Sequence, residues 1–563
     1  METKEKTFQF NLLAKTVKPI VDKKVEGGDL TGALSLLRTS LEKDFSLETI
    51  KDIALTYSEM EQYELSNKYW HKYLSLAPKS MCGIAYEELL MNHFCLENRT
   101  ATVHYFMQKI ELDGFVSDAV LDSGIKDALE EPKKPIFRLL KPVEKADFSY
   151  ELSEARREFS RGRYEKTIEL LTQIPKGCPQ YIDSLEDLSL AYYLQGDAEK
   201  GISIQRELIK EKGENVISFC HLSGMYKTLK NEDKSLYYYN RAKEMQSTDP
   251  EDVYRLAFIA FEREDGAFAI ECMEKIILER AYDVNMLYFY GLALINCNRY
   301  EDAERVLKKA YRINPDERSL AFYIRLCDSL KKGETEYKKY LPLRYYLDYP
   351  ESIYAERIKR LSAFDSKDKK AISNFVKSPK NKELLEWGLN SKNQSLNEAV
   401  AYGLMRAETL IGDKMLIECL MRSDISDHLK RTIIYYLVCK GRKTKINTVM
   451  GNIFFSFKPR PVSFEQDEMG EKFLVSYAMC VSTYALLRVD GGDRLSKQTM
   501  AIYTLLKDRK EMIDFAPEEI SALITYKCNL APLESVKSIA LVYNTEEEKI
   551  NQIIKLYKEC SYD

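Results

Sequence analysis

The sequence predicts an all-α protein, an α-solenoid of repeated helix pairs followed by a helical C-terminal half that carries one short β-hairpin. Three observations support this fold. Small residues recur every 34 positions, at Gly201, Ser235, Ala269 and Ala303, each near the start of the expected second helix of a pair. Elsewhere apolar residues recur mostly at steps of three and four, which is typical of helices. Only residues 445–464 alternate apolar and polar side chains strongly enough to predict strands.

The repeat is most complete at residues 284–317. Gly291 and Ala303 are small where the two helices of the pair are expected to cross, because larger side chains would hold the backbones apart. Pro315 then ends the second helix. The positions that carry the pattern are Leu287, Tyr290, Gly291, Leu294, Ala303, Leu307, Ala310 and Pro315. On these residues the chain resembles the tetratricopeptide repeat (TPR) family, and this resemblance implies a TPR-type superhelix that binds other proteins rather than catalysing a reaction.

The same register extends beyond this repeat. Thr167 continues it upstream, so residues 148–317 are predicted to form a five-repeat array. Residues 1–115 are interpreted as a degenerate sub-array of the same kind. Residues 116–147 lose the period and contain three prolines, which forbid a long helix. This connector is either a flexible joint or an ordered strap packed on its neighbours.

The chain after the array is predicted to stay helical. Residues 318–440 are interpreted as further helical hairpins of the HEAT or TPR kind. Helix is also expected in the string YKKYLPLRYYL, with breaks marked by Pro342 and Pro350. A lysine-rich stretch at 367–382 is either a solvated linker or a nucleic-acid patch. Residues 441–464 are predicted to form the β-hairpin, with Gly451 and Asn452 at its turn. The hairpin either caps an exposed helix end or makes a partner contact.

Residues 465–563 are predicted to form a C-terminal helical bundle. The string FAPEEISALITYKC, followed by SVKSIALVYNTEEEKINQIIKLYKE, is similar to a cyclin box of the general transcription factor B kind. That resemblance implies an alternative function, a transcription-linked regulator with a cyclin-like, helix-turn-helix C-terminal domain. Glu546, Glu547 and Glu548 stand where a recognition helix would approach phosphates, so nucleic acid is not the expected partner.

Composition and motifs narrow the class of function. The formal net charge is −4, which gives no global attraction to nucleic acid or an anionic membrane. No apolar run is long enough to span a membrane, and the twelve cysteines include no CxxC pair, so a reducing cytoplasm is the expected compartment. The sequence has no nucleotide-binding, metal-binding or nucleophile motif. We therefore expect no enzymatic activity, no cofactor and no metal.

The resemblance also names a candidate groove. In TPR superhelices the first helix of each pair lines the concave face, and carrying its positions onto this chain gives Tyr193, Lys227, Tyr254, Phe258, Phe261, Tyr288, Leu292 and Ile295. The rings at 254, 258 and 261 follow helical steps, so one helix presents them as a stripe. The stripe is either core covered by a neighbouring repeat or a groove for an amphipathic helix or apolar peptide. The expected function is a scaffold or adaptor that binds a protein or peptide there.

Overall fold

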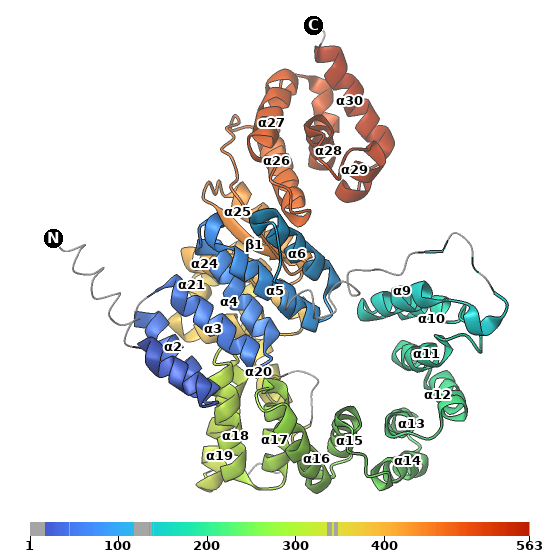
Figure 1. The fold of residues 1–563 in the computed structure, drawn as a ribbon. Helices are drawn as coiled ribbons and strands as arrows, with labels where there is room; N and C mark the ends of the chain where they lie inside the picture. Colours follow the sequence, from blue (N-terminus) through green and yellow to red (C-terminus); the bar gives the residue numbers. More distant parts are fainter. Residues whose placement is uncertain are drawn as a thin grey trace. The chain divides into compact units, whose positions relative to one another are not determined.

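The protein consists of two compact units. The computed structural model describes residues 17–43, 45–117, 134–135, 138, 140–334, 340–342 and 347–561. Residues 124–350 form one unit, which we call the array unit. Residues 1–123 and 351–563 together form the other, the terminal unit. Figure 1 draws both, and each is described here by itself.

The array unit is a curved row of antiparallel helix pairs (Figure 1). Its first helices of each pair are α9 (Ser149–Ser160), α11 (Tyr181–Gln195), α13 (Val216–Thr228), α15 (Pro250–Glu262) and α17 (Val284–Asn296). Their partners are α10 (Tyr164–Leu171), α12 (Ala198–Lys212), α14 (Glu232–Glu244), α16 (Gly266–Glu279) and α18 (Tyr300–Ile313), and α19 (Arg318–Lys331) follows. The TPR-type solenoid predicted from the 34-residue period is confirmed.

The 34-residue period also appears in the backbone conformation of the turns between paired helices. One residue in each turn has a left-handed conformation, with φ between 56° and 100°, and these residues are 34 apart: Gly162, Gly196, Lys230, Glu264 and Asn298. In each turn the next amide donates to the carbonyl oxygen five residues earlier, which satisfies a carbonyl at the end of the first helix. Only two of the five positions are glycine, so this periodic feature is hidden in the sequence.

The small residues lie where paired helices touch. Thr167, Gly201, Ser235, Ala269 and Ala303 are all buried. A Cβ on Gly291 would lie 2.7 Å from the Leu307 side chain of the facing helix, so only glycine allows this crossing. The predicted reason for these small residues is therefore correct.

The predicted connector at 116–147 lies largely outside the described residues. Its described C-terminal end packs against the first helix pair, where Ala146 and Phe148 are buried in a cluster with Leu152. The Arg138 guanidinium lies over the Phe148 ring and forms an ion pair with Glu151.

The terminal unit is built from both ends of the chain. Its N-terminal helices are α2 (Leu30–Lys43), α3 (Leu47–Glu59), α4 (Tyr63–Leu76), α5 (Gly83–Cys95) and α6 (Arg99–Asp113), after a helical stretch at 17–26. Glu61 and Glu97 make the same left-handed turn between paired helices as in the array unit.

The C-terminal part of this unit begins with α20 (Glu351–Leu361), α21 (Lys369–Lys377), α22 (Lys382–Asn390), α23 (Gln394–Ala407), α24 (Leu410–Leu420) and α25 (Asp427–Cys439). After the hairpin come α26 (Glu468–Leu486), α27 (Gly492–Leu506), α28 (Pro517–Cys528), α29 (Val536–Tyr543) and α30 (Glu547–Ser561).

The predicted β-hairpin is confirmed. Strands β1 (Ile446–Met450) and β2 (Ile453–Phe457) pair antiparallel, with Met450 opposite Ile453. Gly451 and Asn452 both have positive φ, 58° and 64°, as a two-residue turn of this hand requires.

The hairpin makes one of the contacts between the N-terminal and C-terminal parts of this unit. The Tyr105 hydroxyl on α6 accepts a hydrogen bond from the Phe454 amide at 2.9 Å and lies 3.1 Å from His71 Nε2. The His93 ring stacks on the Tyr105 ring with centroids 5.7 Å apart. Burial lowers the pKa of His71 to about 3 and of His93 to about 4, so both imidazoles are neutral. The hairpin therefore receives part of its hydrogen bonding from a residue 349 positions earlier.

None of the described helices has the length and apolar run needed to cross a membrane. The twelve cysteines are all unpaired thiols, and most are buried.

Candidate functional site

The candidate groove lies on the first helices of the pairs. Figure 1 shows α11, α13 and α15 on the inner side of the curve, with α12, α14 and α16 outside them. Side chains join these inner helices in succession. The Tyr193 and Thr228 hydroxyls are 2.9 Å apart, and the Lys227 ammonium donates to the Glu262 carbonyl oxygen. This face is therefore continuous from α11 to α15.

The structure divides the eight predicted residues into two groups. Tyr193, Tyr254 and Phe258 are half-buried and Lys227 is exposed, and together with Gly224 they make what we call the open part of the face. Phe261, Tyr288, Leu292 and Ile295 are at most 4% exposed and make the covered part. The covered part lies on α15 and α17 and is continued by Tyr323 on α19.

A segment of the same chain lies over the covered part. The Tyr340 ring packs against the Phe261 ring with centroids 5.5 Å apart, and its hydroxyl donates to the Phe261 carbonyl oxygen at 3.0 Å. The Asn296 side chain at the end of α17 pairs with the main chain of Leu341: its amide nitrogen donates to the Leu341 carbonyl oxygen at 3.1 Å, and its oxygen accepts from the Leu341 amide at 2.8 Å. Leu341 is 1% exposed.

The same segment continues onto α19. The Tyr323 hydroxyl donates to the Asp348 carbonyl oxygen at 2.9 Å, and the Tyr349 ring meets the Phe322 ring edge-on. Tyr288 donates in turn to the Tyr323 hydroxyl at 3.3 Å. We call residues 340–342 and 347–350 the covering segment.

The covering segment corrects one expectation. Helix was expected in YKKYLPLRYYL on both sides of a break at Pro342, but residues 340, 341 and 347 are not helical, and the string's other residues on either side of Pro342 lie outside the described residues. The prolines at 342 and 350 favour an extended backbone in the residues before them. Sequence reasoning also missed Asn296 and Tyr323, because neither falls on a position that the repeat pattern marks.

The open part includes open space beside Gly224. Gly224 lies inside α13, and a Cβ built on it would meet no heavy atom within 4 Å. Tyr254 and Phe258 pack against each other on the neighbouring helix with ring centroids 4.7 Å apart. His221, one turn before Gly224, has a buried Nδ1 with no hydrogen-bond partner among the described residues, and burial lowers its pKa to about 4. The open part thus combines open space with two partly exposed rings.

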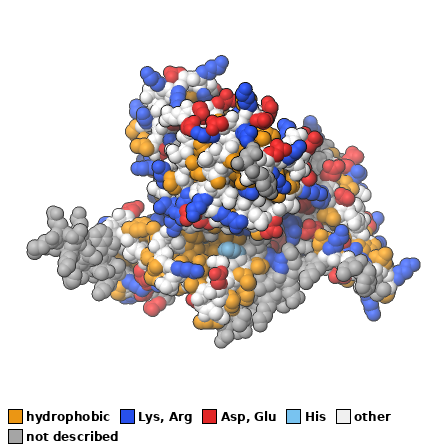
Figure 2. Space-filling model, turned by 90° about the horizontal axis from the view of Figure 1, so that it is seen from above, with side chains coloured by type: hydrophobic (Ala, Val, Ile, Leu, Met, Phe, Trp, Pro, Cys, Tyr) orange, Lys and Arg blue, Asp and Glu red, His pale blue; other side chains and the backbone are white. Residues whose placement is uncertain are grey.

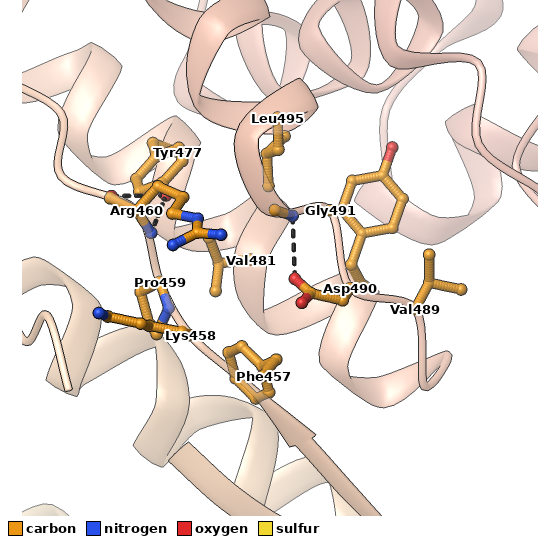
Figure 3. A pocket seen from close by; sticks show the side chains of 12 residues that line it. Phe457, Lys458, Pro459, Arg460, Tyr477, Val481, Val489, Asp490, Gly491 and Leu495 are labelled. Atoms are coloured by element: carbon orange, nitrogen blue, oxygen red, sulfur yellow. Dashed lines mark hydrogen bonds between the residues drawn. The ribbon is translucent and has the colours of Figure 1, made fainter. Parts of the chain in front are cut away.

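Two pockets elsewhere in the described structure offer fewer groups for binding a partner. Figure 3 shows one in the terminal unit, where the Tyr477 hydroxyl donates to the Arg460 carbonyl oxygen at 2.8 Å and the Gly492 amide donates to Asp490 at 2.9 Å. Its volume of about 10 Å³ suits one water molecule.

The second pocket, of about 650 Å³, lies beside α14 and α16. Its two lysines are already paired, Lys243 with Asp265 and Lys275 with Glu271, each at 3.0 Å. Across the described part of the chain, no group of His, Cys, Asp and Glu side chains could hold a metal ion.

A residue in the left-handed conformation separates α29 from α30. Asn544, between α29 and α30, has a left-handed conformation with φ 52° and ψ 50°. The first turn of α30 carries Glu547 and Glu548. Carboxylates at a helix N-terminus favour the helix, but they oppose the approach of phosphates.

These features define a class of protein, a helical-repeat protein with a continuous inner face. A family model described as tetratricopeptide repeat matches residues 284–317, so α17 and α18 form a TPR, as predicted. No curated protein matches the chain.

Solved structures give weak likenesses. The MamA protein is 16% identical, with 34% of this chain and 97% of that chain covered and a TM-score of 0.24. YrrB, titled a TPR protein with an unusual peptide-binding site, is 17% identical, with 32% and 92% covered and a TM-score of 0.25. Yeast Tom70 is 11% identical, with 89% and 97% covered and a TM-score of 0.28. Likenesses at this level carry no conclusion about partners.

Proposed function

We propose that this protein is a non-enzymatic interaction scaffold that holds an extended apolar segment of a partner protein on the open part of the array unit. The open space beside Gly224 is the observation that carries this proposal. A glycine inside a helix costs about 1 kcal/mol relative to alanine. Elsewhere in this array a glycine relieves a close approach, as Gly291 does, but nothing packs on Gly224. The space suits the backbone of a guest.

The residues around Gly224 indicate the chemistry of the partner segment. Tyr254 and Phe258 offer partly exposed rings, and aromatic anchors commonly supply most of the affinity at protein interfaces. Figure 2 shows another side of the molecule, on which acidic and basic side chains are interspersed. In the open part, Lys227 is the only charged residue among the five defined above, and it is exposed. Recognition therefore depends on apolar contact and main-chain hydrogen bonds more than on charge. The unpaired cysteines suit a reducing compartment, and the cytoplasm is the proposed location.

Gly224→Leu tests the proposal, because the leucine side chain would occupy the open space beside residue 224 and its Cβ would meet no heavy atom of another residue within 4 Å. Lys210→Leu is the matched control, since it adds the same side chain to an exposed position of the outer helix α12. Proteins captured by the wild type and by each variant are compared by quantitative mass spectrometry. A partner retained by Lys210→Leu and lost from Gly224→Leu is the expected result. Equal capture by all three chains contradicts the proposal.

A second pair of variants tests the rings. Tyr254→Ala combined with Phe258→Ala is expected to weaken the same partner more than tenfold. Thermal unfolding of the double variant must stay close to that of the wild type. If the double variant unfolds instead, the two rings belong to the core.

A further inference from the structure

The covering segment is held in the way that a peptide ligand would be held. It contributes no described helix or strand to the array unit. The side chains of Asn296 and Tyr323 hydrogen-bond to its main chain, and its Tyr340 hydroxyl donates to the Phe261 carbonyl oxygen. Asn296 binds both the amide and the carbonyl of one residue, Leu341, which is how a side-chain amide can recognise an extended backbone. Tyr323 binds a further main-chain carbonyl, at Asp348.

Main-chain recognition of this kind tolerates changes in the bound sequence. The side chains that the covered part selects are an aromatic ring against Phe261 and a fully buried leucine next to it. Another chain with a tyrosine–leucine pair in an extended conformation would present the same groups. The hydrogen bonds from Asn296 would be available to it unchanged.

The open and covered parts are adjacent on α15. Tyr254, Phe258 and Phe261 follow one another on α15, and Tyr340 packs on the last of them. A guest that lies along the open part and extends past Phe258 therefore reaches the position that Tyr340 occupies. The partner segment and the Tyr340 side chain cannot occupy that position at the same time.

We infer that the covering segment is an internal ligand, and that an extended partner segment carrying a tyrosine–leucine pair competes with it for the face of α15, α17 and α19. This inference rests on the proposed function and deepens it, since it names the partner's chemistry and the device that limits binding. A partner without such a pair would bind the open part only. A partner with it gains the covered part once the internal ligand has left.

The test compares full-length chains. Tyr340→Ala with Leu341→Ala weakens the internal ligand and leaves every residue of the inner face in place. The probe is a labelled peptide that copies residues 338–350 (KKYLPLRYYLDYP), and the control peptide carries alanine at the copies of Tyr340 and Leu341. Binding is measured by fluorescence anisotropy.

The weakened chain is expected to bind the probe at least tenfold more tightly than the wild type, and to ignore the control peptide. Adding Asn296→Ala to the weakened chain is expected to remove this gain, because the main-chain contact is lost. Equal affinity for both chains, or no binding to a weakened chain that keeps its helical circular dichroism, overturns the inference.

A measurement on the wild type covers the case in which the weakened chain does not fold. Hydrogen exchange of the Leu341 amide reports the internal ligand directly, because that amide donates to Asn296. Saturating probe is expected to accelerate its exchange, and unchanged protection overturns the inference. Failure of the proposed function is distinct from this, since it appears as partner capture that ignores Gly224→Leu.

Discussion

Gly224→Ala should stabilise the array unit. Glycine inside a helix is about 0.8–1.0 kcal/mol less favourable than alanine, and the added Cβ meets no heavy atom within 4 Å, so no steric cost offsets the gain. For a unit of this size, about 1 kcal/mol corresponds to a rise of roughly 2–4 °C in melting temperature. Urea unfolding followed by circular dichroism, together with calorimetry, measures both quantities.

The matched control is Gly291→Ala, which makes the same change inside another inner helix. There the new Cβ lies 2.7 Å from the Leu307 side chain, so overpacking is expected to cost about 1–3 kcal/mol. The two variants should therefore shift stability in opposite directions. If Gly224→Ala also destabilises the protein, atoms do occupy the space above that residue, and the reasoning behind the open part is refuted.

Three further outcomes are expected. Tyr105→Phe leaves the half-buried Phe454 amide without its acceptor, which should lower the free energy of unfolding by about 1–3 kcal/mol in chemical denaturation. No change would show that the hairpin does not depend on this bond. Burial lowers the pKa of His71 to about 3 and of His93 to about 4, so below about pH 6.5 the unfolded chain binds more protons than the folded chain. The free energy of unfolding should therefore be largest above that pH and fall as the pH drops toward 4, by up to about 1.4 kcal/mol per pH unit for each residue. A urea midpoint that is constant between pH 7.5 and 5 would contradict this. Asn296→Ala removes both hydrogen bonds to Leu341 and should cost about 1–3 kcal/mol, with faster hydrogen exchange confined to the covering segment. Exchange that stays slow would mean that the other contacts of the covering segment are enough to hold it.

The repeat was predictable because its determinants are local. Ala269 and Ala303 are small for a reason that lies within one helix pair, and the 34-residue spacing repeats that reason along the chain. The hairpin was predictable on the same ground, since Gly451 and Asn452 supply the left-handed turn that two-residue loops need. In both cases the deciding contacts are close in sequence.

The rest of the site depends on contacts that no periodicity encodes. Tyr288 occupies a predicted groove position, but it is buried, and its hydroxyl donates to Tyr323 on α19, which lies beyond the five predicted repeats. Lys230 and Glu264 adopt the left-handed turn conformation without belonging to the residue types that favour it, because the surrounding helix pair imposes the turn. Sequence could therefore locate the face, but it could not show which part of it was already occupied.

The construction of the terminal unit has a consequence during synthesis. Tyr105 leaves the ribosome 349 residues before its hydrogen-bond partner at Phe454. At translation rates of about 5–20 residues per second, the helices that carry Tyr105 and His71 wait roughly 20–70 s for the hairpin that completes their hydrogen bonds. Over that interval the nascent chain exposes an unfinished surface while the array unit is being made. A chaperone that shields α4 to α6 until residue 457 has emerged would shorten the time in which this surface can meet another unfinished chain.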